Sequence, residues 1–201
     1  MLSIFLARLV SVIFHPLFVP LYAVLYLFAG NPFLFGSEIG FAVRTIILNC
    51  IFFPLIAVLL MKALGIIESL ELPSRQDRIL AYIPVCVCLI WACTVLYKEA
   101  HIEALSDVMI GVCIALSIAF VVNSVYAKIS MHTLGMGGLV AIALFSTQNI
   151  AIADTSYWLM AIILLAGMVG TARLLLKAHT LPEIYYGYFF GFMSCAFPLI
   201  F

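Results

Sequence analysis

The chain has 201 residues, of which 67% are hydrophobic and 9% are charged, and its nine basic and nine acidic side chains cancel. Soluble domains carry roughly 25% charged residues, so this composition excludes an ordinary soluble domain and indicates a membrane protein. The balanced charge gives no reason to expect a nucleic-acid partner. We expect a single domain, residues 1–201, with an all-α fold.

Apolar stretches separated by polar breaks predict a bundle of six to seven transmembrane helices, because a helix needs about 20 apolar residues to cross a bilayer. Pro16 and Pro20 interrupt the first stretch, so residues 2–14 can form a separate interfacial helix, and we interpret His15 as a histidine at this helix break. Pro54 predicts a kink in the second stretch. No small-residue cleavage site follows the first apolar segment, so we expect no cleavable signal peptide. The predicted spans are 9–29, 41–67, 79–97, 105–126, 133–150, 157–176 and 184–201.

All six cysteines lie in apolar stretches, where a cysteine usually behaves as a small hydrophobic residue. The closest pair, Cys86-Val-Cys88, lacks the spacing of metal ligands. We therefore expect neither a disulfide nor a metal site.

Three polar breaks, 68–78, 128–132 and 173–183, are each separated by two predicted spans. Two crossings return the chain to the face from which it started, so all three breaks are expected on one side of the membrane. The loops on the opposite side contain Arg44, Lys98 and His101 but no comparable cluster. Charges that only cap helices at the headgroups are not expected to sort in this way.

The third break, Arg173-Leu-Leu-Leu-Lys177-Ala-His179-Thr-Leu-Pro-Glu183, combines an arginine, a histidine and a carboxylate. If a helix begins after Lys177, His179 and Glu183 are four residues apart and share one face. The carboxylate can then hold one ring nitrogen and leave the other free, and the planar fork of Arg173 can bind an oxyanion. This combination indicates phosphate chemistry. The alternative is three charged residues that cap a membrane helix at headgroup level.

The middle break places Ser130 and His132 just before a predicted helix that is rich in glycine. A helix start presents free backbone N–H groups and the positive end of its dipole, which favour a phosphate oxygen, and the Ser130 hydroxyl can donate to the same oxygen. In the alternative, Ser130 is only an N-cap, and the glycines only let helices pack closely. These glycines are Gly135, Gly137 and Gly138.

The first break contains Arg75 and Arg78, whose i, i+3 spacing places them on one face of a helical turn. Arginine binds phosphate through paired donors, so both can contribute to an anion pocket. In the alternative, they extend to the lipid headgroups, with Asp77 partly neutralising them.

In this order the three breaks resemble the motifs of the phosphatidic acid phosphatase type 2 superfamily, which includes membrane lipid phosphatases and vanadium haloperoxidases. The third break, with Arg173-x5-His179-x3-Glu183 after an alanine, is similar to Ser-Arg-x5-His-x3-Asp. The middle break, with Ser130-Met131-His132, keeps the Ser and His of Pro-Ser-Gly-His. The first break is a loose counterpart of Lys-x6-Arg-Pro and lacks its lysine, its spacing and its adjacent proline. The resemblance covers residues 75–191.

The resemblance implies hydrolysis of a lipid phosphate or pyrophosphate through a phosphohistidine, without a metal or another cofactor. In such a reaction His179 is the nucleophile, Glu183 orients it, and His132 protonates the leaving lipid oxygen. A preorganised cluster of donors holds the equatorial oxygens. The implied members of this cluster are Arg173, Ser130, the Met131 amide, and one or both of Arg75 and Arg78.

Phosphatidic acid, phosphatidylglycerol phosphate, undecaprenyl pyrophosphate and lipid A phosphates all fit as substrates, and the oligomeric state stays open. The resemblance favours a bacterial inner membrane with the site at the outer face, whereas the basic residues on the motif side favour the cytoplasm by the positive-inside rule. The rival interpretation is a non-catalytic lipid-binding or transport protein with a degenerate site, in which Asn123 and the broken helices would serve. We interpret Gly187 and Gly191, a G-x-x-x-G pair, as helix packing.

Overall fold

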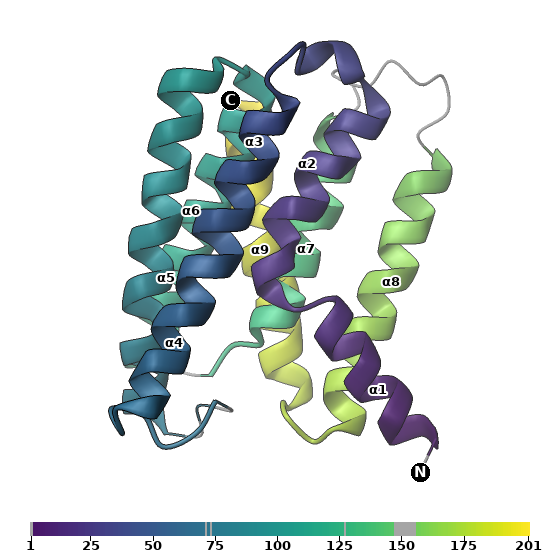
Figure 1. The fold of residues 1–201 in the computed structure, drawn as a ribbon. Coiled ribbons are helices and arrows are strands. Elements are labelled where there is room, and N and C mark those ends of the chain that lie inside the picture. The colour runs from purple at the N-terminus through teal and green to yellow at the C-terminus, as the bar shows by residue number, and fades with distance from the viewer. Residues whose placement is uncertain (1, 71, 73, 127, 147–155) are drawn as a thin grey trace.

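The computed structural model describes residues 2–70, 72, 74–126, 128–146 and 156–201, and all regular structure in these ranges is helical (Figure 1). The expected all-α class is therefore confirmed. In chain order the elements are α1 (Leu2–Ile13), the 3₁₀ turn η1 (Pro16–Phe18), α2 (Val19–Gly30), the 3₁₀ turn η2 (Pro32–Leu34), α3 (Ile39–Ile46), the π-helical segment η3 (Ile47–Phe52), α4 (Phe53–Ala63), α5 (Arg75–Val95), the π-helical segment η4 (Leu96–Ala100), α6 (Glu103–Val125), α7 (Met131–Phe145), α8 (Ser156–Leu175) and α9 (Leu181–Ile200).

The N-terminal apolar stretch forms two helices rather than one. α1 ends at Ile13, and Pro16 opens η1, because proline cannot donate the backbone hydrogen bond that would continue the helix. The Nδ1 atom of His15 caps this turn by accepting from Leu17 N at 3.4 Å. The axis of α1 is not in line with that of α2, and α1 packs against α8 (Figure 1). The separate first helix expected from Pro16 and Pro20 is therefore present.

The second apolar stretch is continuous, but its winding changes before Pro54. The backbone N–H of Phe53 reaches back five residues to the Leu48 carbonyl, which is the π-helical pattern of η3. Pro54 has no N–H to donate, so the ordinary four-residue pattern is interrupted at this point. Where a kink was expected at Pro54, the structure has the π-helical segment η3 directly before it.

Five helical stretches in the described part of the chain are long and apolar enough to cross a membrane. The predicted six to seven spans are thus reduced to five candidates, because the apolar α7 has only 15 residues and α9 is not among the five. The end of the predicted fifth span, 147–150, lies outside the described residues. The five candidates are Leu2–Gly30, Ile39–Ala63, Arg75–Ala100, Glu103–Val125 and Ser156–Leu175.

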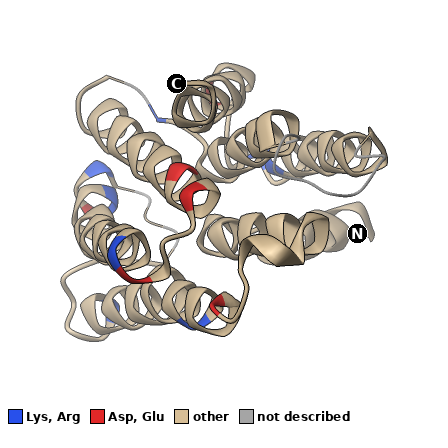
Figure 2. Cartoon of the chain, turned by 90° about the horizontal axis from the view of Figure 1, so that it is seen from above, with Lys and Arg blue, Asp and Glu red and all other residues tan. Residues whose placement is uncertain are grey.

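The outside of the bundle is apolar. Large hydrophobic side chains on several helices are exposed, among them Trp91, Leu164 and Phe189. In the end-on view of Figure 2, most of the ribbon belongs to residues without charge. Soluble monomers rarely expose contiguous apolar patches beyond a few hundred Å². Together with the five candidate spans, this surface indicates an integral membrane protein.

α7 and α9 form the most extensive helix pair in the described structure. A Cβ atom at Gly191 would overlap the Leu134 carbonyl oxygen, and one at Gly187 would overlap Thr133 Oγ1. The two backbones are therefore in direct contact, which confirms the interpretation of this G-x-x-x-G pair as helix packing. Because both helices begin at the same end of the bundle, their contact brings the segments that precede them together (Figure 1).

The three polar breaks lie at one end of the bundle, as expected (Figure 1). Lys128 Nζ donates to the Ala178 carbonyl at 2.9 Å, which joins the middle break to the third. Arg75 and Arg78 lie at the start of α5, so the helical turn expected for them is confirmed. Ser74 starts that helix four residues earlier than predicted, as its hydroxyl accepts from Asp77 N at 3.0 Å.

Candidate functional site

A hydrogen bond joins the side chains of His179 and Glu183 at the start of α9. The distance from His179 Nδ1 to Glu183 Oε2 is 2.8 Å. The prediction of a shared helical face is wrong, because α9 begins at Leu181, two residues after the histidine. Thr180 is the N-cap of a capping box, and the Glu183 carboxylate folds back to accept from Thr180 N at 3.3 Å. This local motif places the carboxylate beside the histidine.

Burial decides the protonation state of His179. Its side chain is only 8% exposed, and this burial lowers the pKa of His179 to about 4. The hydrogen bond to Glu183 opposes the shift, whereas the nearby cations Lys128 and Arg173 favour it. At neutral pH the ring is therefore uncharged, with Nδ1–H donated to the carboxylate and a lone pair available on Nε2.

Ser130 stands at the N-cap position of α7, but its side chain does not cap the helix. The residue is fully buried, and Ser130 Oγ has no hydrogen-bond partner among the described residues. Its backbone N–H donates to the Glu183 carbonyl at 3.2 Å, which fixes the start of α7 against that of α9. The N-cap alternative is thus wrong for this hydroxyl, which remains free to donate to another group.

Met131 and His132 follow in the first turn of α7. The Met131 sulfur accepts from the hydroxyl of Tyr82 on α5 at 2.8 Å, so its side chain is held toward that helix. His132 is buried, and its Nε2 lies 3.0 Å from the Ser11 carbonyl oxygen of α1. The glycines of this helix pack against α2 and α9: a Cβ at Gly135 would come within 2.7 Å of Val19, and one at Gly138 within 2.8 Å of the Cys195 sulfur.

Arg173, near the end of α8, reaches the same α1 residue. Its Nη1 donates to Ser11 Oγ at 3.3 Å, while its Nε is buried without a partner in the described structure. The guanidinium is close enough to both His132 and His179 for its charge to act on each ring. The structure therefore places Arg173 near one histidine of the middle break, His132, and one of the third break, His179. It also leaves two buried donors, Arg173 Nε and Ser130 Oγ, without acceptors.

Two residues beside His132 and Arg173 were not predicted as site residues from the sequence, namely Ser11 and His15. Ser11 carries no recognisable motif. His15, interpreted as a histidine at a helix break, does cap η1, but its ring also lies edge-on to His132 with 5.4 Å between the centroids. The chain has four histidines, and their scarcity in so apolar a sequence is the signal that identifies His15.

Arg75 and Arg78 take a different place from the other predicted phosphate ligands. The Arg75 side chain is exposed. Arg78 is partly buried, and its Nη1 donates to the Leu72 carbonyl at 3.3 Å. One turn later, Tyr82 contacts Met131, so this face of α5 is turned toward the start of α7.

A pocket of about 430 Å³ lies beside His179 at the polar end of the bundle. Of the predicted site residues, His179 and Glu183 line this pocket. Its wall does not include the other predicted site residues, which are Arg173, Ser130, Met131, His132, Arg75 and Arg78. Lys128, which the sequence analysis did not select, supplies a cation there and is held by the Ala178 carbonyl. The lining residues are Lys128, Leu174, Lys177, Ala178, His179, Thr180 and Glu183.

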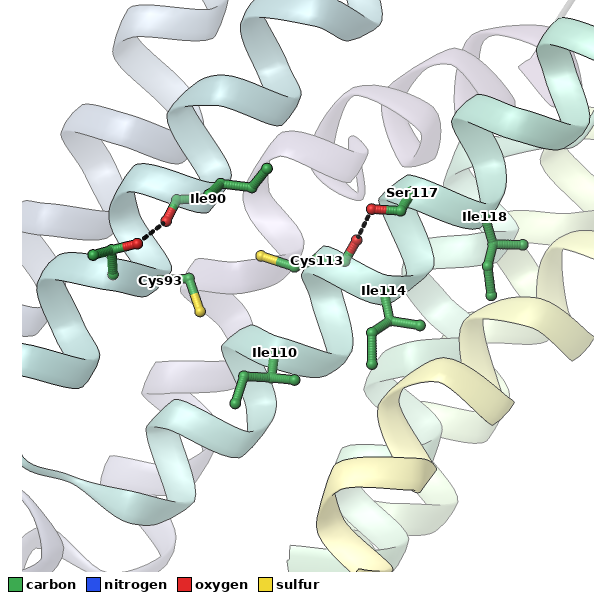
Figure 3. A pocket seen from close by; sticks show the side chains of 8 residues that line it. Ile90, Cys93, Ile110, Cys113, Ile114, Ser117 and Ile118 are labelled. Carbon is green, nitrogen blue, oxygen red and sulfur yellow. Dashed lines mark hydrogen bonds between the residues drawn. The ribbon is translucent and has the colours of Figure 1, made fainter.

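A second pocket, of about 410 Å³, lies between α5 and α6 and contains none of the predicted site residues (Figure 3). Isoleucines and two free cysteines, Cys93 and Cys113, line most of it. The Thr94 and Ser117 hydroxyls in its wall donate to carbonyls of their own helices. This apolar surface within the candidate spans offers no group for phosphate chemistry.

The described residues contain no group of three or more His, Cys, Asp or Glu side chains that is arranged to hold a metal ion. Comparisons of the chain with models of protein families, with curated proteins and with solved structures found no match.

Proposed function

We propose that this protein is an integral membrane phosphatase that hydrolyses the phosphomonoester or pyrophosphate of a lipid through a phosphohistidine intermediate. The observation that carries the proposal is the neutral, carboxylate-held imidazole of His179 with Arg173 close to it. Arg173 Nε and Ser130 Oγ are buried donors without acceptors in the described structure. Buried donors are rarely left without partners. In the proposal, oxygens of a bound phosphate are the acceptors that Arg173 Nε and Ser130 Oγ lack.

The proposed reaction has two displacements at phosphorus. His179 Nε2 attacks, the bond from phosphorus to the lipid oxygen breaks, and doubly protonated His132 gives its Nδ1 proton to that oxygen. Because burial and the charge of Arg173 lower the pKa of His132 to about 3, the ring takes up this proton only beside the anionic substrate. Water then attacks the phosphohistidine, releasing phosphate and regenerating the imidazole, and the proton from water returns to His132. Glu183 stabilises the positive charge that develops on the His179 ring. Arg173 offsets the charge on the equatorial oxygens.

The phosphate-binding cluster proposed here has Arg173, Ser130 and the first-turn amide of Met131 at its centre. Of the two arginines of α5, we assign Arg78 to this cluster rather than Arg75, because Arg78 is partly buried on the helix face that meets Met131 through Tyr82. Phosphate in a site of this kind is bound mainly by paired and preorganised donors.

The rival function is a non-catalytic lipid-binding or transport protein. Asn123, one of the features that suggested it, is hydrogen-bonded within the protein. The Asn123 amide donates to the Tyr82 hydroxyl at 3.0 Å and to the Ala119 carbonyl at 2.8 Å, and its oxygen accepts from Ile129 N at 3.1 Å. These bonds give Asn123 a structural role between α6 and the start of α7. The rival remains an outcome of the test below.

The proposal includes a location in the bacterial inner membrane with the site toward the outer face, as the family resemblance favours. Lys177 lines the pocket beside His179 and is exposed. A Lys177→Cys variant should therefore react with a membrane-impermeant maleimide added to intact cells. Labelling only after the cells are broken would place the site in the cytoplasm.

The decisive experiment measures phosphate release from a panel of lipid phosphates and pyrophosphates by the purified protein, without added metal. We expect release, its loss in His179→Ala, and competitive inhibition by vanadate, which resembles the transition state of phosphoryl transfer. A chelator should have no effect. No release across the panel would favour the rival function, and chelator inhibition reversed by magnesium or zinc would remove the basis for His179 as nucleophile.

A further inference from the structure

Ser11 is a buried residue of the N-terminal helix whose two polar groups both face the candidate site. Its carbonyl oxygen lies 3.0 Å from His132 Nε2, and its hydroxyl accepts from Arg173 Nη1 at 3.3 Å. The three residues come from α1, α7 and α8, so this contact joins helices that are far apart in the sequence. No other described residue bonds to both of these side chains.

The position of Ser11 follows from the break in the first apolar stretch. Ala7 and Ser11 are the buried residues of α1, and their i, i+4 spacing gives the helix one small-residue face toward α8. The Tyr22 hydroxyl donates to the Ile13 carbonyl at 2.6 Å, which fixes the end of α1 to α2 beyond the turn. The helix is therefore held where Ser11 meets the end of α8 that carries Arg173.

A carbonyl oxygen that faces one ring nitrogen determines the tautomer of a histidine. The Ser11 carbonyl can only accept, so it holds one ring proton of His132 on Nε2 whether the ring is neutral or charged. Nδ1 is then the nitrogen that takes up the second proton and gives it to the leaving oxygen. Glu183 does the same for His179, with the two nitrogens reversed. The Ser11 hydroxyl orients the Arg173 fork at the same time, and the other donors of the guanidinium remain for an anion.

We propose that Ser11 is a positioning residue of this site, which fixes the tautomer of His132 through its carbonyl and the orientation of Arg173 through its hydroxyl. The inference rests on the proposed phosphatase function for its catalytic consequence. It makes α1 part of the site.

Substitution separates the two contacts, because Ser11→Ala removes the hydroxyl and keeps the carbonyl. The hydrogen bond from the charged Arg173 to Ser11 is long at 3.3 Å, so its loss should raise KM for a lipid phosphate about 3- to 10-fold and weaken vanadate inhibition by a similar factor. The kcat value should change less than 2-fold, on the order of the scatter between assays, since the proton transfer by His132 keeps its acceptor. Ser11→Thr should restore KM. Ser3→Ala, on an exposed position of the same helix, is the matched control.

A double-mutant cycle tests whether Ser11 acts through Arg173. Adding Ser11→Ala to Arg173→Lys should cost little beyond Arg173→Lys alone, because the partner of the hydroxyl is already altered. Fully additive losses in kcat/KM, or an unchanged KM in Ser11→Ala, would overturn the role of the hydroxyl. A loss of activity in Ser11→Ala that Ser11→Thr fails to restore would also contradict it.

A measurement without turnover tests the carbonyl contact. In the full-length protein labelled with ¹⁵N-histidine, with the signal assigned through a His132→Gln variant, His132 should show the Nε2–H tautomer, and Ser11→Ala should leave it unchanged. A signal averaged between tautomers, or an Nδ1–H tautomer, would refute the contact. If the protein hydrolyses no lipid phosphate, the proposed function fails, and this spectrum alone decides the role of Ser11.

Discussion

Glu183→Gln separates the two tasks that the Glu183 carboxylate performs in the structure. The carboxylate closes the capping box of α9 by accepting from Thr180 N, and it accepts the Nδ1–H of His179 at 2.8 Å. Glutamine also serves at this position of a capping box, so the helix start should survive. The charge that stabilises a developing imidazolium would be lost.

The expected size of the effect follows from the geometry. A hydrogen bond to a charged group contributes roughly 1.5 to 3 kcal/mol, and about 1.4 kcal/mol corresponds to a factor of ten in rate. Glu183→Gln should therefore lower kcat/KM for a lipid phosphate about 10- to 100-fold. Because Glu183 raises the pKa of His179 against the effect of burial, its loss should also move the acid limb of the pH profile to lower pH.

The assay is phosphate release in mixed detergent–lipid micelles, accompanied by the melting temperature of each variant. Glu103→Gln is the matched control, because Glu103 also lies in the first turn of a helix, α6, but at the opposite end of the bundle. Unchanged kcat/KM in Glu183→Gln would refute the assigned role of the carboxylate. A loss of activity that matches a loss of thermal stability would show that capping, rather than chemistry, explains it.

Three further predictions follow from the same structure. His132→Ala should slow turnover about 10²- to 10⁴-fold when assayed well below the melting temperature of the variant, the usual range for general acid catalysis, and near-normal turnover would exclude that role. Gly191→Ala should destabilise the protein by about 1 to 3 kcal/mol, because its Cβ would overlap the Leu134 carbonyl. Gly167→Ala, whose Cβ would enter open space, should not, and equal melting temperatures for the two variants would contradict the close contact of α7 and α9. Finally, between pH 6.5 and about 4 the unfolded chain binds a proton that folded His179 does not, so stability should fall with pH across this window by up to about 1.4 kcal/mol per unit. The slope should be smaller in His179→Gln, and identical slopes measured by thermal unfolding would refute the assigned pKa.

The sequence was sufficient for those features that depend on composition and on short spacings. The scarcity of charge predicts the helical, apolar exterior, since backbone groups in a bilayer must be satisfied within a helix. The even number of spans between polar breaks predicts that the breaks meet at one end. Gly187 and Gly191 predict a close helix contact, although not with which helix.

Local spacing predicted the His179–Glu183 pair, but for the wrong reason. The i, i+4 interval suggested a shared helical face, whereas Thr180 and Pro182 start α9 later and the carboxylate folds back as part of a capping box. A capping signature and a helical interval overlap in this segment, and only the conformation of the backbone distinguishes them. The same holds at Ser130, where an N-cap residue leaves its hydroxyl unbonded.

The composition of the site was decided by tertiary structure alone. Ser11 lies 121 residues from His132 and 162 residues from Arg173 in the sequence, and no local pattern connects them. They meet because η1 turns α1 away from α2 and onto α8, while glycines bring α7 against α9. Side chains that act on one anion must converge in space, and such convergence depends on the packing of whole helices rather than on the spacing of residues along any one of them.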